Sequence, residues 1–131
     1  MIKNQMVKIL KDLELDRPGC ELCMGSALLM YGIRDEAHDA DIAVSEDMFQ
    51  EYLEKGYPIE CNTWGRERIL IDINGFEIEL FRETLMEVES KEFEGFYVQT
   101  LESIIKWKEH LGREKDLRDL KIIKEYIDEN R

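Results

Sequence analysis

Two aspartates, Asp39 and Asp41, lie two residues apart at the start of an apolar run at residues 42–44. Such a run predicts a strand. Because successive side chains of a strand point to opposite faces, both carboxylates are expected on the same face. Two carboxylates beside an apolar strand either face open water or bind cations, since burying unpaired charges is costly. This pair is the first candidate for chemistry.

A Gly-Ser pair, Gly25-Ser26, precedes the aspartates and opens a short apolar segment at residues 27–31. We expect a strand over residues 20–24, then a Gly-Ser turn and a helix, with Ser26 as the N-cap. A helix N-terminus offers unpaired N–H groups and the positive end of the helix dipole, which suits a phosphate. A phosphate cradle beside a cation-binding carboxylate pair predicts nucleoside triphosphate chemistry with Mg²⁺.

The combined pattern is Gly25-Ser26, about a dozen intervening residues, and Asp39-x-Asp41 followed by apolar residues. It resembles the signature of the nucleotidyltransferase superfamily, whose fold is that of the polymerase β catalytic domain. The resemblance implies that the two aspartates hold Mg²⁺ and that Gly25 and Ser26 hold the terminal phosphates of a nucleoside triphosphate.

Two further stretches, GIR at residues 32–34 and LGREKDLRDL at residues 111–120, resemble segments of small antibiotic-type and toxin–antitoxin-type members. By this resemblance, a lysine from a helix beyond the aspartate strand contacts the triphosphate. Lys108 is the first candidate, because it falls on the buried stripe of its helix and needs an anion unless it extends to solvent. Lys115 is a second phosphate candidate.

Other charged residues near these motifs have structural alternatives. Arg34 offers a planar fork of donors to a phosphate, or it pairs with Asp35 or Glu36. We expect Asp116 and Asp119 to hold the corner between the last two helices rather than to do chemistry, with Asp116 as the N-cap of the final helix.

The clearest local signal is a hairpin over residues 68–81 with an Asn-Gly turn at residues 74–75. Asn-Gly is the favoured two-residue turn between paired strands. The resemblance implies a third carboxylate on such a strand, in an apolar-acid-apolar pattern. Glu79 matches that pattern, and Glu77 is its rival because it shares the face; many members have Asp there. The alternative is a solvent-facing row of acids on an antiparallel sheet.

Hydrophobic periodicity and capping signals assign the other elements. They predict a single α+β domain over residues 1–131, a small mixed β-sheet flanked by helices, with a C-terminal helical pair closing one side. The remaining expected elements are a helix over residues 2–14, a helix between a Ser45 N-cap and a stop at Lys55-Gly56, strands at residues 58–63 and 92–98, and a helix between Thr100 and Gly112.

Composition limits the partners. The chain carries 30 acidic against 18 basic residues, a net charge of −12. A nucleic-acid polymer requires a basic surface, so a small cationic acceptor or a basic patch on a partner protein fits better. No apolar run approaches the length of a membrane span, so we expect no membrane association. Three cysteines without a secretion signal indicate reduced thiols in the cytoplasm.

These observations predict a Mg²⁺-dependent nucleotidyltransferase that moves a nucleoside monophosphate from a nucleoside triphosphate to a hydroxyl of a small molecule. Asp39, Asp41 and Glu79 would bind the metal, and Glu79 could also take the proton of the acceptor. Two alternatives stay open: the acceptor is a partner protein, as in toxin–antitoxin members, or the chain is a non-catalytic nucleotide-binding or interaction module. A homodimer could supply an acceptor lobe.

Overall fold

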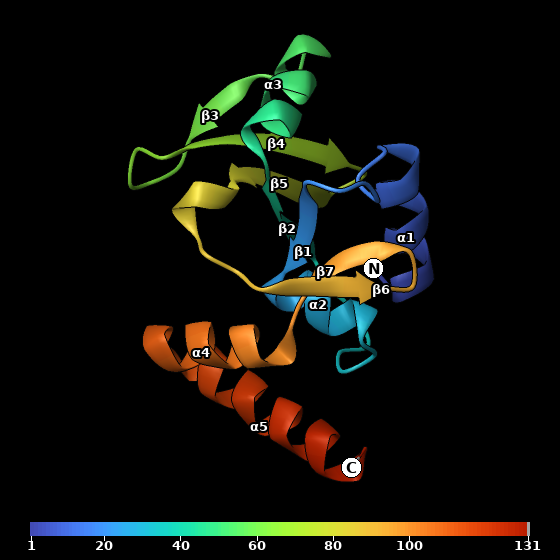
Figure 1. The fold of residues 1–131 in the computed structure, drawn as a ribbon, viewed down its shortest axis with the longest axis vertical. Helices are drawn as coiled ribbons and strands as arrows, with labels where there is room; N and C mark the ends of the chain where they lie inside the picture. Colours follow the sequence, from blue (N-terminus) through green and yellow to red (C-terminus); the bar gives the residue numbers. More distant parts are fainter. Residues whose placement is uncertain (131) are drawn as a thin grey trace.

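A seven-stranded mixed sheet forms the centre of the computed structural model, which describes residues 1–130 (Figure 1). Its strands are β1 (Cys20–Cys23), β2 (Asp39–Val44), β3 (Ile59–Cys61), β4 (Glu67–Ile73), β5 (Phe76–Arg82), β6 (Ser90–Phe93) and β7 (Phe96–Gln99). Their order across the sheet is β3-β4-β5-β2-β1-β7-β6. β2 pairs antiparallel with β1 and parallel with β5, so the aspartate strand lies at the middle of the sheet.

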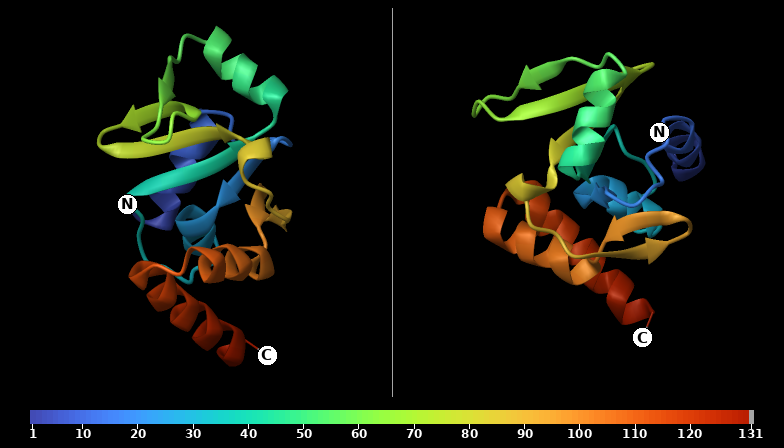
Figure 2. Two further views of the ribbon diagram at one scale, coloured as in Figure 1. Left: turned by 90° about the vertical axis from the view of Figure 1, so that its left-hand side faces the viewer. Right: turned by 45° about the horizontal axis from the view of Figure 1, so that its top comes forward.

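Helices pack around this sheet. They are α1 (Lys3–Asp12), α2 (Met24–Met30), α3 (Glu46–Glu54), the short 3-10 helix η1 (Glu83–Leu85), α4 (Leu101–Leu111) and α5 (Glu114–Glu129). The left view of Figure 2 looks onto β2, β4 and β5 with α1 behind them, while α4 and α5 pack together below the sheet. The predicted α+β fold with a mixed sheet is confirmed. Over residues 1–130, every helix is too short or too polar to cross a bilayer.

The predicted hairpin is β4 and β5. Its turn residues Asn74 and Gly75 both have positive φ, 53° and 88°, as a two-residue hairpin turn requires. The side chain of Asp72 accepts a hydrogen bond from the N–H of Gly75 at 2.8 Å and supports the turn. The Asn-Gly signal therefore located the strand that carries Glu79.

A second hairpin replaces the single strand that we expected over residues 92–98, and that prediction is wrong. β6 and β7 pair antiparallel around Glu94 and Gly95, whose φ values are 49° and 86°. Glu94 occupies a position that usually takes Asn, Asp or Gly, so the sequence lacked the common turn signature. The hairpin matters for the site because β7 lies beside β1 and leads directly into α4.

Helix caps agree with the sequence at three positions. The side chain of Ser45 accepts the N–H of Met48 at the start of α3, and Thr100 accepts the N–H of Ser103 at the start of α4. Gly112 ends α4 in the left-handed conformation, with φ of 61°. These caps fix where the helices start and stop relative to the strands.

The expected N-cap of α5 is wrong. The helix begins three residues earlier than we expected, with Arg113 as the N-cap and Asp116 at the third helical position. The carboxylate of Asp116 accepts the backbone N–H of Arg113 at 3.2 Å, so it still satisfies a free donor at the helix start. The shift brings Lys115 into the first turn of α5.

The apolar core holds β2 from one side. Met6 and Leu10 of α1 are fully buried, which confirms the predicted N-terminal helix in a slightly shorter form. Phe49 and Tyr52 of α3 are also fully buried, and they join the same cluster as Ile42 of β2. Burying side chains of this size removes a large apolar area from water, which makes β2 a rigid support for its two aspartates.

Candidate active site

Asp39 and Asp41 lie at the first and third positions of β2 and face two acids of the parallel strand β5. In register, Asp39 is opposite Glu77 and Asp41 is opposite Glu79. Asp41 and Glu79 are half-buried and together line a cavity of about 210 Å³, whereas Glu77 is exposed at the beginning of β5. Between the two rival glutamates, the structure therefore brings Glu79 to the buried aspartate.

The environment of Asp41 opposes its ionisation. Burial raises the pKa of Asp41 to about 7, and the negative charges of Asp39 and Glu79 add to the shift. Lys115 opposes it from the first turn of α5. A carboxyl whose pKa is raised this far by desolvation and like charges is stabilised when it binds a cation or a proton.

The carboxylate of Glu79 also contacts an arginine of β4. Its Oε1 lies 3.3 Å from Nη1 of Arg68, and both side chains are partly buried. Within residues 1–130, no group of three or more acidic, histidine or cysteine side chains is close enough to hold a metal ion as placed. Glu79 also lies close enough to Asp41 for a side-chain hydrogen bond that helps to raise the pKa of Asp41. The donors are the carboxylate oxygens that Mg²⁺ prefers, so a three-carboxylate metal site requires Glu79 to exchange its contact with Arg68 for the metal ion.

A cleft of about 590 Å³ opens between the aspartates of β2 and the helices α4 and α5. Its walls bring together residues from the beginning, middle and end of the chain. The predicted site residues that line it are Gly25, Arg34, Asp39, Asp41, Lys108 and Lys115.

Ser26 does not take the place that we expected. α2 starts at Met24 directly after β1, its N-cap is Cys23, and Ser26 sits at the third helical position. The Ser26 hydroxyl is buried and donates to the carbonyl oxygen of Cys23 at 2.8 Å, and it lies 3.4 Å from the carbonyl oxygen of Asp41. The prediction of a Ser26 N-cap is wrong, because the strand passes into the helix without a turn, and the hydroxyl ties β1 to β2.

Gly25 makes room for Arg34. A β-carbon at Gly25 would lie 2.8 Å from Nη1 of Arg34, closer than carbon and nitrogen can pack. Arg34 does not pair with Asp35 or Glu36; its Nη2 donates to Oδ2 of Asp119 at 2.6 Å. In this structure the glycine of the Gly-Ser pair therefore allows an arginine from the following loop to reach α5.

Lys108 is buried, with a side chain only 4% exposed, and its ammonium forms ion pairs with two carboxylates of the protein. It donates to Oδ2 of Asp119 at 2.8 Å and to Oδ1 of Asp116 at 3.3 Å. Arg113 completes the cluster through its guanidinium contacts with Asp116. The lysine neither extends to solvent nor lacks an anion, and the expectation that both aspartates hold the helix corner is confirmed.

Lys115 differs from Lys108. It is exposed, lines the cleft and makes no ion pair with the described part of the chain. Because its charge acts on Asp41, its ammonium lies on the side of the cleft that faces the aspartates. Of the two predicted lysines, Lys115 therefore keeps its charge available to an incoming anion.

Sequence reasoning missed several cleft residues. Arg66 comes from the turn between β3 and β4, Trp107 and His110 come from α4, and Arg113 precedes α5. Arg113 belongs to the LGREKDLRDL run, so the motif offered a signal for it. No sequence motif pointed to Arg66, because its place in the cleft depends on how the turn between β3 and β4 folds.

Comparison with solved structures decides the fold. A crystal structure from Thermotoga maritima, described as a "putative nucleotidyltransferase", superposes with a TM-score of 0.64 at 16% sequence identity. The match covers 98% of this chain and 96% of the other. This chain has the nucleotidyltransferase fold. No protein-family model matches the sequence, and no curated protein matches it.

The nucleotidyltransferase fold brings the strands that carry the acids side by side at the cleft. β2 carries Asp39 and Asp41, β5 carries Glu79, and the two strands are neighbours although a helix and two strands separate them in sequence. At 16% identity the likeness concerns the fold, so the chemistry has to be argued from the residues of this chain.

Proposed function

We propose that the chain transfers a nucleoside monophosphate from a Mg²⁺-bound nucleoside triphosphate to the hydroxyl of a small-molecule acceptor. The observation that carries this proposal is Asp41. It is a half-buried carboxyl whose pKa is raised to about 7 beside Asp39 and Glu79, at the edge of a 590 Å³ cleft. Such a group gains most from a bound divalent cation, and the nucleotidyltransferase fold agrees with this chemistry.

Each residue has a distinct part in this proposal. Asp39 and Asp41 would hold Mg²⁺ together with Glu79, and the ion would supply charge neutralisation and a lower pKa for the acceptor hydroxyl. Glu79, after leaving Arg68, takes the proton of that hydroxyl. Lys115 binds the phosphates and stabilises the developing negative charge of the leaving pyrophosphate.

A second cavity beside the cleft supports the acceptor class. It measures about 510 Å³, and Met86 and Trp107 form a wall shared with the cleft. Its other polar lining residues are Glu21, Glu83, Glu87, Glu89, Ser103 and Lys106. Four carboxylates against one ammonium favour a cationic small molecule, and the volume is in the range of small-molecule sites.

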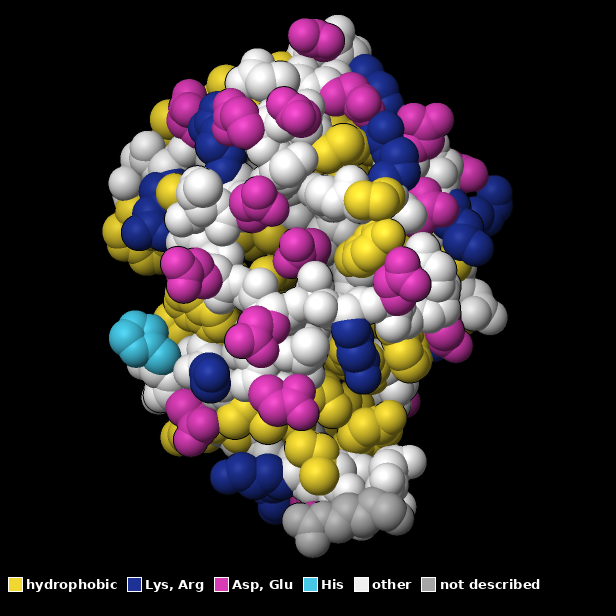
Figure 3. All heavy atoms as spheres, viewed as in Figure 1, with side chains coloured by type: hydrophobic (Ala, Val, Ile, Leu, Met, Phe, Trp, Pro, Cys, Tyr) yellow, Lys and Arg dark blue, Asp and Glu magenta, His cyan; other side chains and the backbone are white. Residues whose placement is uncertain are grey.

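The face of the molecule shown in Figure 3 supports a small acceptor over a nucleic-acid polymer. On this face, Asp and Glu side chains are spread among Lys and Arg, and the basic side chains do not form a continuous tract. A polymer backbone requires such a tract, because counterion release at many phosphates supplies most of the affinity. The net charge of −12 agrees with this proposal.

Thermal melting tests the nucleotide site first. Each of the four nucleoside triphosphates is added with and without Mg²⁺ to the wild type and to the Asp39→Asn/Asp41→Asn double variant. Ligand at a hundred times its dissociation constant stabilises a protein by about 2.7 kcal/mol, which raises Tm by several degrees. We expect a Mg²⁺-dependent rise in the wild type that is lost in the double variant.

Transfer itself is tested with α-labelled nucleotide and a panel of cationic, neutral and anionic small molecules. Label on a cationic hydroxyl compound supports the proposal, and label on a co-expressed protein would make a partner protein the acceptor. Should no nucleotide shift Tm under any condition, nucleotidyl transfer is overturned and an interaction module replaces it.

A further inference from the structure

Arg66 lies in the turn between β3 and β4, on the opposite side of the cleft from the helices. It lines the 590 Å³ cleft with Asp39 and Asp41, and it also lines the 210 Å³ cavity with Asp41 and Glu79. In Figure 1 this turn extends from the upper part of the sheet on the same side as the end of α4 that leads into α5. Arg66 therefore faces the acids from a wall that no predicted nucleotide-binding residue occupies.

The turn that carries Arg66 is held by a set of hydrogen bonds around Asn62. The side-chain Oδ1 of Asn62 accepts the N–H groups of Trp64 at 2.9 Å and of Arg66 at 3.0 Å. The backbone N–H of Asn62 donates to the carbonyl of Arg66 at 2.9 Å, and Gly65 supplies a positive φ of 74°. Hydrogen bonds at both its N–H and its carbonyl oxygen fix the backbone of Arg66, so its side chain starts from a defined place.

The charge of Arg66 is available, in contrast to most cations of the cleft. Arg34, Lys108 and Arg113 are engaged with Asp116 and Asp119. Within residues 1–130, the guanidinium of Arg66 makes no hydrogen bond or ion pair, although it lies near a group of carboxylates. A planar guanidinium in such a place is suited to two oxygens of a phosphate group.

We propose that Arg66 binds the polyphosphate of the nucleotide and, with Lys115, holds it from two opposite walls of the cleft. This proposal rests on the nucleotidyl-transfer function above and adds a phosphate-binding residue to it. Lys115 comes from the first turn of α5 and Arg66 from the β3–β4 turn, so a triphosphate between them lies over Asp39 and Asp41. Two cations on opposite walls hold the chain of phosphates in line above the acids.

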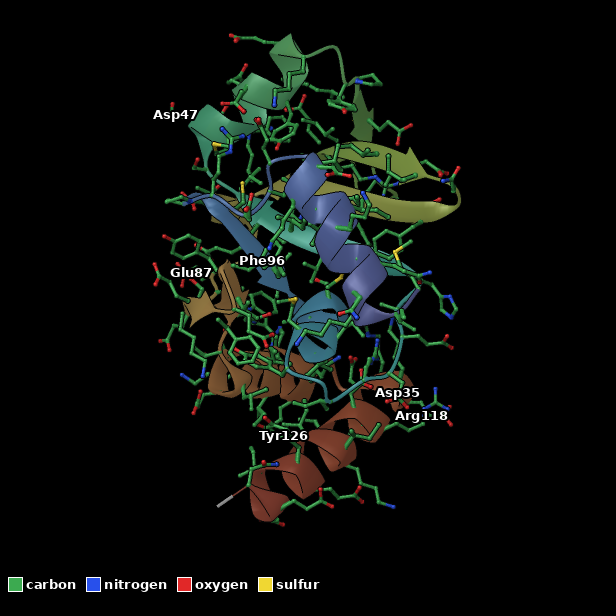
Figure 4. All side chains as sticks on the ribbon, turned by 90° about the vertical axis from the view of Figure 1, so that its right-hand side faces the viewer. Asp35, Asp47, Glu87, Phe96, Arg118 and Tyr126 are labelled. Carbon is green, nitrogen blue, oxygen red and sulfur yellow. The ribbon has the colours of Figure 1, made fainter. Side chains whose placement is uncertain are left out.

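Isothermal titration calorimetry with inorganic tripolyphosphate and Mg²⁺ tests this role without knowledge of the base. The variants are Arg66→Ala, Arg66→Lys and the control Arg118→Ala. Arg118 is an exposed arginine that projects from α5 (Figure 4). We expect Arg66→Ala to weaken tripolyphosphate binding roughly tenfold or more, Arg66→Lys to restore part of it, and Arg118→Ala to match the wild type. Tm should stay at the wild-type value in all three.

The outcomes separate the two proposals. Binding of tripolyphosphate by Arg66→Ala within twofold of the wild type would overturn the role of Arg66 while nucleotidyl transfer stands. A wild type that binds neither tripolyphosphate nor any nucleoside triphosphate overturns nucleotidyl transfer, and the role of Arg66 with it. A loss of affinity in Arg66→Ala that comes with a fall in Tm would mean a structural role, and this too overturns the proposal.

Discussion

Asp41 on β2 and Glu79 on β5 occupy opposite positions of one parallel strand pair, and both side chains line one cavity. The two strands were located by sequence signals far apart, the Asp-x-Asp pair and the Asn-Gly hairpin, and the structure shows that they pair in parallel. Their proximity has an energetic cost, because two like charges share a partly dehydrated site. The acids are therefore a source of instability in the absence of a cation.

The first prediction concerns the stability of Asp41→Asn. Between about pH 4 and 7 the unfolded chain ionises this carboxyl while the folded chain keeps its proton, because the folded pKa is about 7. The free energy of unfolding therefore falls as pH rises through this window. We expect Asp41→Asn to be more stable than the wild type at pH 8 by about 1–3 kcal/mol, and to be inactive in transfer.

Urea denaturation of both proteins at pH 5 and pH 8, without divalent cations, measures this difference. Asp35→Asn is the matched control, because Asp35 is exposed and its charge is not among the causes of the raised pKa of Asp41. The gain should appear at pH 8 in the Asp41 variant and be much smaller in the control. Equal stabilities of wild type and Asp41→Asn at pH 8 would contradict the burial and repulsion described here, and transfer activity in Asp41→Asn would contradict its catalytic role.

The second prediction concerns the cluster around Asp119. Its carboxylate accepts from both Arg34 and Lys108, and Lys108 is almost fully buried. Removing one partner of a buried pair leaves a charge without compensation. We expect Asp119→Asn to lower the free energy of unfolding by about 3 kcal/mol, whereas Glu125→Gln on the exposed face of α5 changes it by less than about 0.5 kcal/mol.

The same cluster predicts the response to acid. Burial opposes the ionisation of Asp119, but hydrogen bonds from Arg34 and Lys108 outweigh it and hold the pKa of this carboxyl below its ordinary value. Its contribution is therefore present above the unfolded pKa of about 3.9 and is lost as pH falls through the lower folded pKa. Denaturation below pH 4 should show a shallower loss of stability in Asp119→Asn than in the wild type; parallel curves would refute this.

The third prediction concerns Gly25→Ala. The new β-carbon displaces the guanidinium of Arg34, which lies 2.8 Å from the position that it would occupy. Because the end of an arginine side chain is flexible, we expect a moderate cost of about 1–2 kcal/mol, the loss of the Arg34–Asp119 pair and weaker nucleotide binding. Calorimetric melting and nucleotide titration measure both effects.

The double variant Gly25→Ala/Arg34→Ala separates the two parts of this effect. If Gly25 serves to accommodate Arg34, the alanine at position 25 costs nothing further once Arg34 is absent. Additive costs in melting would mean that Gly25 acts independently of Arg34. A loss of nucleotide affinity that Gly25→Ala causes even without Arg34 would mean that a phosphate approaches the backbone of Gly25.

The fourth prediction concerns Lys115→Ala. Lys115 is exposed and without an ion pair among the described residues, so its removal should leave Tm unchanged at pH 5, where Asp41 keeps its proton. Its loss removes the charge that opposes the raised pKa of Asp41, and that pKa should rise further. We expect nucleotide affinity in the presence of Mg²⁺ to fall roughly tenfold. Lys121→Ala, also exposed on α5, is the control, and equal affinities of both variants would refute the role of Lys115.

The fold was predictable where local sequence signals are strong. Asn74-Gly75 specified one hairpin, and Ser45, Thr100 and Gly112 marked helix ends that the structure confirms. The hairpin at Glu94-Gly95 was missed, because glutamate is an unusual residue for a left-handed position and the two strands are only four residues long. Turn chemistry, rather than the apolar pattern, limited that prediction.

The site was predictable in its acids and less so in its cations. Alternation along one strand placed Asp39 and Asp41 on one face, and the family resemblance, rather than the alternation, pointed to Glu79 on a second strand. Pairing among charges could not be read in the same way, because Arg34 reaches Asp119 across 85 positions of the chain. Lys108 looked like a ligand for a phosphate in sequence, and only the folded chain shows that its anions are internal.

The short connection between α4 and α5 has a consequence for proteolysis. The first two turns of α5 hold Lys115, Asp116 and Asp119, and the partners of the two aspartates, Arg34 and Lys108, lie earlier in the chain. A cut near Gly112, or a stop codon there, would remove all three at once and leave a buried ammonium without a counterion. The seven strands would keep their full sequence, so a protease could switch off the cleft while sparing the strands that bear the acids.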